Sequence, residues 1–310
     1  MDVPYRIMTL NIRPPSPGPI GAVEYHRSDT ILAHPRFGAA REAYVDFVLR
    51  TYREEPTLNR LLIDQGNQYV FFVLVCLHAG FIEADRSSWP TMRLLQTTME
   101  SLGVSSSRRV HGIVTRLMAE GYVRAEKAVS DNRVRLLHPT EKMLAYDRES
   151  LVGFYVALDA MFPEPGYGPP MRRDRVFQKA QRLASLGMIA HSARFIMANP
   201  TIRYFLPREA GVPILIQLIK LCGHHADQSS PRVSFAQIGS NFGVSRTHVR
   251  TLLQGAEELG FARLDGNCVA LTPQCHADFD RFVADCMSGN DLIYRLATAS
   301  PAPSRLGRRP

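Results

Sequence analysis

The sequence predicts a mainly α-helical protein with two small β-hairpins, built from two copies of one structural unit. Three observations lead to this prediction. Short sequence landmarks recur in the same order in both halves of the 310-residue chain. Apolar residues recur at helical spacing along most of its length. In each half, a short pair of strand-like segments follows the run of helices.

The repeated landmarks define the two units. In order along the chain, they are Pro56-Thr57 and Pro200-Thr201, Gly103-Val104-Ser105 and Gly243-Val244-Ser245, Gly121-Tyr122 and Gly260-Phe261, and Leu137 and Leu271. Solenoid repeats have periods of roughly 20 to 50 residues. The paired landmarks here are separated by far more than one such period, so the repeat indicates duplicated domains. We therefore expect an extended, Pro-rich arm over 1–34, a first domain over 35–161, a linker over 162–174, a second domain over 175–297 and a basic, disordered tail over 298–310.

The segments outside the domains are rich in proline. The arm contains Pro14-Pro15-Ser16-Pro17-Gly18-Pro19, which cannot form a helix or a central strand. Within the first domain, helices are expected over 41–53, 67–79 and 143–161. The second of these is apolar nearly all round, as expected for a helix at the centre of the body. In the second domain, the corresponding long helices are expected over 175–197 and 276–297.

The second unit contains a clear pair of short helices. Ser234 is a good N-cap for a helix that ends near Phe242, and Gly243 then permits the left-handed turn that stops it. Ser245 caps a second helix over 246–259, whose apolar positions form one stripe. Two helices joined by a tight glycine-containing turn are typical of a helix-turn-helix.

Each helix pair precedes a hairpin. In the second unit, strands are expected over 261–264 and 268–271 around Asp265-Gly266-Asn267, since Asp-Gly is a strong signal for a short hairpin. The first unit has the same plan, with helices over 91–102 and 105–120 and strands from Tyr122 to Leu137. Its hairpin is longer and more polar. A hairpin in this position is the wing of a winged helix-turn-helix.

At this level of detail the chain resembles the MarR family of winged-helix transcription regulators. Asp131-Asn132-Arg133, followed by a strand and then Thr140, is similar to that family's wing. The first unit departs from the pattern, with His138-Pro139 in place of Leu-Thr and Met143 near the expected glycine. The second unit keeps Leu271-Thr272 but lacks the Asp-x-Arg. The resemblance covers most of residues 40 to 295.

The resemblance also has implications for assembly. Members of the family are normally homodimers in which the terminal helices of two chains interlock. Two units in one chain therefore imply tandem winged helix-turn-helix domains that form an intramolecular pseudo-dimer. The chain would act as a monomeric pseudo-dimer or as a homodimer of such chains.

The candidate DNA-binding residues follow from these elements. Hydroxyls and arginines in the first turns of a helix can contact phosphates and guanine edges in a major groove. In the first unit the candidates are Ser105, Ser106, Ser107, Arg108, Arg109 and His111 on the helix, with Lys127, Asp131, Arg133 and Arg135 on the wing. In the second unit they are Ser245, Arg246, Thr247, His248 and Arg250. The resemblance implies that Arg133 enters a minor groove while Asp131 orients its guanidinium. Because the two sets differ, we expect an asymmetric operator.

The charge distribution is consistent with double-stranded DNA as the partner. The formal net charge is +8, and between Ser105 and Arg135 there are seven basic residues against three acidic ones. The longest apolar run, Tyr69 to Leu77, is too short to span a bilayer, so no membrane association is expected. Five cysteines without disulfide or zinc spacing favour a reducing cytoplasm.

The sequence also contains candidate small-molecule and metal-binding residues. The aromatic residues Tyr69, Phe71, Phe72, Tyr146, Phe154 and Tyr155 lie on helices expected to meet near the centre of the body. The resemblance implies a small aromatic ligand there, and plain core packing is the alternative. The sets Cys222, His224 and His225, and Cys268, Cys275 and His276, lack paired metal-ligand spacing. No metal and no cofactor are therefore expected. The sequence shows no nucleophile paired with a base, no paired-carboxylate site and no phosphate loop, so no enzymatic activity is expected.

Three classes of function fit these features. The first is a sequence-specific, ligand-responsive DNA-binding transcriptional regulator. The second is a plasmid-type replication initiator, which also uses tandem winged helices and would need directly repeated sites. The third is a winged-helix scaffold for protein interactions, whose association would depend weakly on salt, whereas DNA binding falls steeply with salt.

Overall fold

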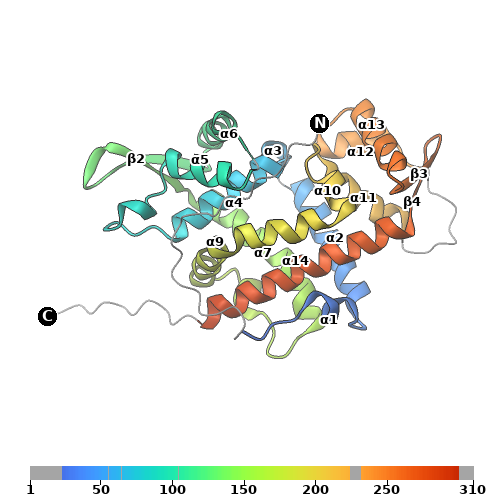
Figure 1. Cartoon of the computed structure of the whole chain (residues 1–310), viewed down its shortest axis with the longest axis horizontal. Helices are drawn as coiled ribbons and strands as arrows, with labels where there is room; N and C mark the ends of the chain where they lie inside the picture. Colours follow the sequence, from blue (N-terminus) through green and yellow to red (C-terminus); the bar gives the residue numbers. More distant parts are fainter. Residues whose placement is uncertain (1–22, 55, 64, 104, 224–231, 300–310) are drawn as a thin grey trace.

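The computed structural model describes residues 23–54, 56–63, 65–103, 105–223 and 232–299. They form a mainly helical body with two separate two-stranded antiparallel sheets (Figure 1). This confirms the predicted mainly helical class with small β-hairpins. The proline run Pro14–Pro19, the tail from Pro301, and His224 and His225 lie outside the described residues.

The first half of the chain contains seven α-helices and one hairpin among its described residues. In order, these are α1 (Ser28–Leu32), α2 (Phe37–Glu54), α3 (Pro56–Leu61), α4 (Gln65–Ala79), the 3-10 helix η2 (Arg86–Ser88), α5 (Met92–Ser101), α6 (Ser107–Ala119), β1 (Val123–Ala128), β2 (Asp131–Pro139) and α7 (Glu141–Met161).

The second half repeats this order. Its elements are α8 (Gly168–Met171), α9 (Arg175–Ala198), α10 (Pro200–Phe205), α11 (Gly211–Cys222), α12 (Phe235–Phe242), α13 (Arg246–Glu258), β3 (Ala262–Asp265), β4 (Cys268–Leu271) and α14 (Pro273–Ala299). Among the described residues, η2 is the one element of the first half without a counterpart in the second.

Several predicted boundaries shift in the structure. The arm predicted to be extended includes α1, and the predicted linker includes α8, where two prolines occupy the first turn of a short helix. The hairpin of the second half turns through Gly266 and Asn267, because Asp265 already pairs with Cys268 across the two strands. Gly266 has a φ of 59°, which favours glycine at this position.

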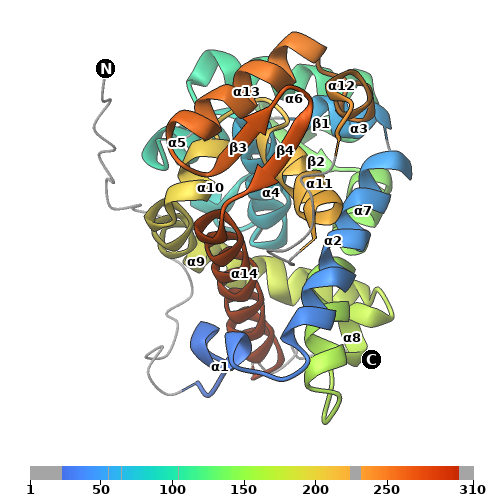
Figure 2. The ribbon, with the colours of Figure 1, turned by 90° about the vertical axis from the view of Figure 1, so that its right-hand side faces the viewer.

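The two halves pack across each other. The long helices pair within each half, α2 with α7 and α9 with α14. In addition, α4 packs on α9 and α11 packs on α2, while α1 lies on α14 and α8 lies on α7. Figures 1 and 2 show α14 as a long helix beside α9. Each half therefore covers parts of the other.

The hydrophobic core follows this crossed arrangement. The largest cluster of buried residues joins Val45 of α2 and Tyr155 of α7 to Phe205 of α10 and Phe279 of α14. A second cluster centres on α4, whose side chains are buried as predicted, and includes Ile189 from α9. The predicted domains 35–161 and 175–297 thus share a core across the boundary drawn from the sequence.

Candidate nucleic-acid interface

The helix pair α12–α13 has the geometry that the sequence predicts. The hydroxyl of Ser234 caps α12, and that of Ser245 caps α13 by accepting a hydrogen bond from the backbone N–H of His248 at 3.0 Å. Gly243 ends α12 with a φ of 72°. On α13, the stripe of Val249, Leu252, Leu253 and Ala256 is buried. The opposite side of α13 is therefore left to solvent.

The helix pair α5–α6 is similar but has a longer turn. Thr91 caps α5, and Gly103 has a φ of 68°. The cap of α6 is Ser106, whose hydroxyl accepts from the backbone N–H of Arg109 at 3.4 Å. The cap Ser106 comes three positions after Gly103, whereas Ser245 comes two positions after Gly243. The structural counterpart of Ser245 is therefore Ser106, and the predicted match to Ser105 is off by one residue.

This extra residue changes the environment of the predicted serines. Ser105 lies before the helix, and its hydroxyl is buried without a hydrogen-bond partner among the described residues. The hydroxyl of Ser107 donates to the carboxylate of Glu100 on α5. Of the three consecutive serines, Ser106 is exposed and caps the helix. The helix predicted from Ser105 begins at Ser107 for this reason.

The basic candidates on both helices are exposed to solvent. On α6, these are Arg108, Arg109 and His111, which face away from the buried stripe of Val110, Ile113, Val114 and Leu117. On α13, Arg246, Thr247 and Arg250 are exposed. His248 differs, because it is half-buried and its Nε2 atom lies 2.8 Å from the carbonyl oxygen of Glu209. The His248 ring is therefore bound to the backbone of Glu209 and does not project freely into solvent.

The hairpin β1–β2 presents three of its predicted basic residues. Lys127 and Arg135 lie opposite each other in the register, and both are exposed, as is Arg133. A register shift follows Lys127, so the strands are irregular just before the turn. In the other hairpin, β3 and β4 are four residues each, and the exposed basic side chain there is that of Arg263. The first hairpin is the longer and more basic of the two.

Asp131, which pairs with Ala128 beside the turn of the first hairpin, holds two arginines. Its Oδ1 atom accepts from the backbone N–H of Arg133 at 3.1 Å and from Nε of Arg133 at 3.2 Å. Its Oδ2 atom accepts from Nη2 of Arg86 at 2.9 Å. The hydrogen bonds from Arg133, followed by that from Arg86, lower the pKa of Asp131. The carboxylate is thus ionised, and the side chain of Arg133, 92% exposed, projects from a fixed base.

Arg86 is a residue that the sequence did not single out. It lies on η2, and its guanidinium is 5.1 Å from the ring centroid of Trp89. Trp89 is buried with Ala128 and Leu136 of the hairpin, and its indole N–H donates to the carbonyl of Glu83. No local pattern links Arg86 to Asp131, since 45 residues separate them. The loop around η2 therefore supports the hairpin from one side.

The two exposed helices share one side of the molecule. In Figures 1 and 2, α6 and α13 both lie along the upper edge of the body, and Figure 1 shows the hairpins at its opposite ends. Between them, α3 contacts α6, while Arg60 of α3 reaches the turn of the other pair near Gly243. The two helices that carry basic candidates, α6 and α13, therefore lie along one edge.

A cavity of about 620 Å³ lies within the body, between the two halves. Its walls come from α1, α2, α3, α4, α7, α9 and α14. Four of the six aromatic residues predicted to meet at the centre line it, namely Phe71, Phe72, Tyr146 and Phe154. Tyr155 belongs instead to the core, where its hydroxyl donates to the side-chain oxygen of Gln181 at 2.8 Å. Tyr69 is partly buried against the α4 core and is not part of the wall.

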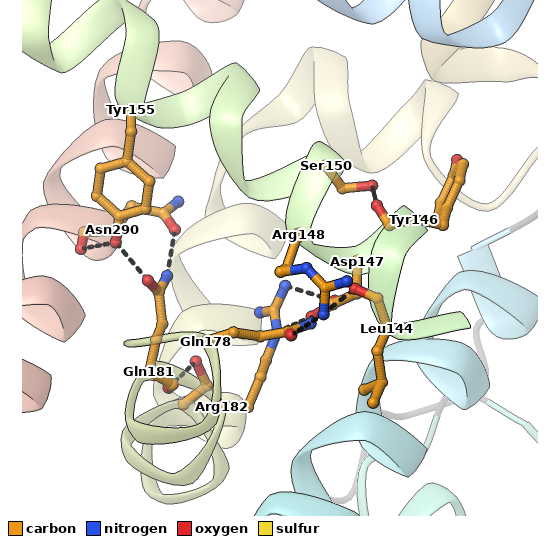
Figure 3. A network of polar contacts seen from close by, with 11 residues as sticks. Leu144, Tyr146, Asp147, Arg148, Ser150, Tyr155, Gln178, Gln181, Arg182 and Asn290 are labelled. Atoms are coloured by element: carbon orange, nitrogen blue, oxygen red, sulfur yellow. Dashed lines mark hydrogen bonds and ion pairs between the residues drawn. The ribbon is translucent and has the colours of Figure 1, made fainter. Parts of the chain in front are cut away.

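A buried polar network forms part of the cavity wall and joins α7 to α9 (Figure 3). Arg182 donates from Nε and Nη2 to the two oxygens of Asp147, at 3.0 and 2.7 Å. Gln178 donates to the same carboxylate at 2.7 Å and accepts from Arg148 at 2.9 Å. Arg148 in turn bonds Glu141 at the start of α7, one residue after the cap that follows β2. The network thus extends from the cavity towards the base of the first hairpin.

Among the described residues, no group of three or more His, Cys, Asp or Glu side chains could hold a metal ion. All five cysteines are free, and burial raises the pKa of the thiols of Cys76 and Cys275 to about 12. Within the described residues, no helix combines the length and the apolar character that a membrane span requires.

Comparison with known proteins adds no relative: no protein-family model, no curated protein and no solved structure matches the chain.

Proposed function

We propose that the protein is a sequence-specific regulator of transcription that binds double-stranded DNA through two tandem winged helix-turn-helix units. In this proposal, α5, α6 and β1–β2 form one unit, and α12, α13 and β3–β4 form the other. The observation that carries it is the exposed, basic face of two capped helices on one edge of the molecule, beside a hairpin that projects Arg133. The crossed packing of the halves supports an intramolecular pseudo-dimer.

The reading helices would be α6 and α13. Arg108 and Arg109 lie in the first turn of α6, where an arginine can make a bidentate contact to the edge of a guanine in a major groove. Arg133 would enter the neighbouring minor groove or contact its phosphates. Asp131 restricts the orientation of that guanidinium before DNA binds, so less side-chain entropy is lost on binding.

The first unit would be the main reader. Its hairpin is longer and carries Lys127, Arg133 and Arg135, whereas the second hairpin offers Arg263 beside the acidic Asp265. On α13, the ring of His248 is held by Glu209 and would have to move before it could contact a base. This difference supports an operator with two unlike half-sites.

The central cavity supports a ligand-responsive regulator. It touches α7, which continues from the first hairpin, as well as α9 and α14 of the other half. A ligand that binds one relative placement of these helices better than another shifts the population toward that placement. Through α7, such a shift would reach the hairpin.

DNA binding can be tested with a salt series. The probes are genomic DNA fragments, and the proteins are the parent chain, an Arg108→Ala/Arg109→Ala variant and an Arg133→Ala variant. Each lost phosphate contact is expected to reduce the slope of log K against log salt by about 0.9. Arg172→Ala, at the end of α8 at the lower end of the body in Figure 2, is the matched control for the loss of one charge.

The expected result is that the parent selects specific fragments and that the first-unit variants lose affinity with a shallower slope, while Arg172→Ala does not. A parent chain with no salt-dependent DNA binding would refute the proposal. In that case, the exposed helices would bind a protein partner instead. Selection of directly repeated sites from a replication origin would favour a replication initiator.

A further inference from the structure

The charges that line the central cavity are balanced within the protein. Arg182 and Asp147 form a two-bond ion pair in which both residues are buried, at 7% and 3% exposed. At another part of the wall, Arg281 binds Asp29 at 2.7 Å and Asp285 at 3.0 Å. The wall also includes Arg27, which is exposed. With it, the guanidiniums and the carboxylates of the wall are equal in number.

The buried pair opposes the entry of a charged ligand. An anionic ligand would have to compete with Asp147 for Arg182, and it would leave the Asp147 carboxylate buried with only the bond from Gln178. A cationic ligand would have to compete with Arg182 for Asp147, and it would leave the Arg182 guanidinium buried without its carboxylate. Breaking a buried pair by removing one partner is strongly unfavourable, because it leaves an uncompensated charge in the interior. Arg27 lies in solvent, where water weakens its attraction for an anion.

Eight aromatic rings contribute to the remaining wall, beside aliphatic and small polar side chains. Phe71 and Phe72 of α4 face the cavity together with Phe154 and Tyr146 of α7 and Phe47 of α2. Aromatic rings arranged in this way bury a planar ligand by stacking and edge contacts. The volume of about 620 Å³ lies within the range of roughly 300 to 1,000 Å³ that is typical of sites for drug-sized molecules.

A few polar groups on the wall can orient a ligand. The phenol oxygen of Tyr52 lies 3.5 Å from Nε2 of Gln68, a long hydrogen bond in which the phenol accepts. The phenol proton therefore remains available to an acceptor on a ligand. Burial raises the pKa of Tyr52 far above neutrality, so the phenol stays a neutral donor. The hydroxyl of Tyr146, by contrast, donates to the side-chain oxygen of Asn59 at 2.9 Å.

We propose that the cavity is a binding site for an uncharged, mainly aromatic molecule that accepts a hydrogen bond from the Tyr52 phenol. This inference rests on the ligand-responsive part of the proposed function and names its ligand class. It is narrower than the small aromatic ligand that the resemblance to MarR regulators implies, since Arg182, the buried guanidinium of the wall, is already paired with Asp147.

The test compares two probes that differ in charge. Naphthalene-2-carboxamide is neutral at pH 7.5, and naphthalene-2-carboxylate has nearly the same shape but is anionic. Binding of each to the full-length chain, without DNA, is measured by isothermal titration calorimetry. The carboxamide is expected to bind at least tenfold more tightly. Equal or tighter binding of the carboxylate would overturn the proposal, as would the absence of binding by both probes.

Variants locate the site. Ser150→Phe places a ring into the cavity from α7 and is expected to abolish binding of the carboxamide. Thr298→Phe is the matched control. Like Ser150, Thr298 donates a hydrogen bond from its hydroxyl to the backbone carbonyl four residues earlier, but Thr298 is exposed and does not line the cavity. Tyr52→Phe keeps the shape of the wall and should weaken binding several-fold. Binding that is unchanged in both Ser150→Phe and Tyr52→Phe would contradict the proposed site.

DNA binding of the ligand-free chain is measured separately in the salt series. A chain that binds the carboxamide but no DNA would refute the proposed regulator while leaving the ligand site in place. A chain that binds DNA but neither probe would refute the proposed ligand site while leaving the proposed DNA binding in place.

Discussion

The ion pair between Arg182 and Asp147 yields a quantitative prediction about stability. Substitution of Arg182 by Met removes both hydrogen bonds from its guanidinium to the carboxylate, at 3.0 and 2.7 Å. Asp147 is 3% exposed and retains the bond from Gln178 at 2.7 Å. A buried carboxylate that loses its cationic partner costs about 3 to 5 kcal/mol. Because Gln178 remains bound to Asp147, we expect Arg182→Met to lower the free energy of unfolding by about 3 kcal/mol, the lower end of that range.

A second substitution separates charge from packing. Asp147→Leu/Arg182→Met removes both charges together and leaves Gln178 its other bond, to the carbonyl of Leu144 at 2.9 Å. Replacing a buried ion pair by apolar residues is often neutral. The double variant should therefore be more stable than Arg182→Met alone, by about 2 kcal/mol or more.

Urea denaturation followed by circular dichroism at 222 nm measures these differences. Arg124→Met is the control, because Arg124 forms an exposed ion pair with Glu126 at 3.1 Å, with side chains 60% and 50% exposed. An exposed pair contributes less than about 1 kcal/mol. If Arg182→Met costs no more than Arg124→Met, or if the double variant is less stable than Arg182→Met alone, the account of the buried pair is wrong.

Three further predictions concern the turn, the hairpin and pH. Gly243→Ala forces a φ of 72° on a residue with a Cβ, so it should lower the free energy of unfolding by about 1 kcal/mol in a urea titration; an unchanged midpoint would contradict the strain argument. Arg86→Ala removes one support of the first hairpin without removing Arg133, and DNA affinity in the salt series should fall by less than for Arg133→Ala; an equal or larger loss would show that Arg86 itself contacts DNA. Burial, followed by the neighbouring His138, lowers the pKa of His78 to about 4. Because an unfolded histidine titrates near 6.5, the unfolded state binds more protons in between, and stability should fall as the pH decreases from about 6.5 to 4. The thermal midpoint of a His78→Leu variant should depend less on pH over that range, and equal slopes would contradict this reading.

Local features of the fold could be predicted from the sequence because their causes are local. A serine or threonine before an apolar stripe identifies Ser234 and Ser245 as helix caps, and a glycine after the stripe identifies Gly243 as the turn. The sequence placed the first cap near Ser105, where three serines follow one another. Any of them can cap a helix, and the choice of Ser106 depends on packing against α5, which the sequence alone does not specify.

Long-range contacts could not be predicted in the same way. The contact of Arg86 with Asp131 joins a 3-10 helix to a hairpin, and neither segment signals the other. The central cavity is lined by side chains from both halves. The sequence predicts that the aromatic residues of α4 and α7 meet near the centre, but it does not predict the ion pair between Arg182 and Asp147 in the cavity wall. The split of 35–161 from 175–297 followed the repeat, whereas burial follows the crossed helices.

The crossed packing has a consequence for how binding responds to dilution. In a homodimer, two helix-turn-helix units separate once the protein falls below the dissociation constant of the dimer. Here α1 on α14, α8 on α7, α4 on α9 and α11 on α2 are contacts within one chain, so the units stay together at any concentration unless the chain unfolds. The second unit is always present beside the first at a fixed effective concentration. In the proposed regulator, a single chain at nanomolar concentration would therefore occupy a two-part site with a simple, first-order dependence on protein.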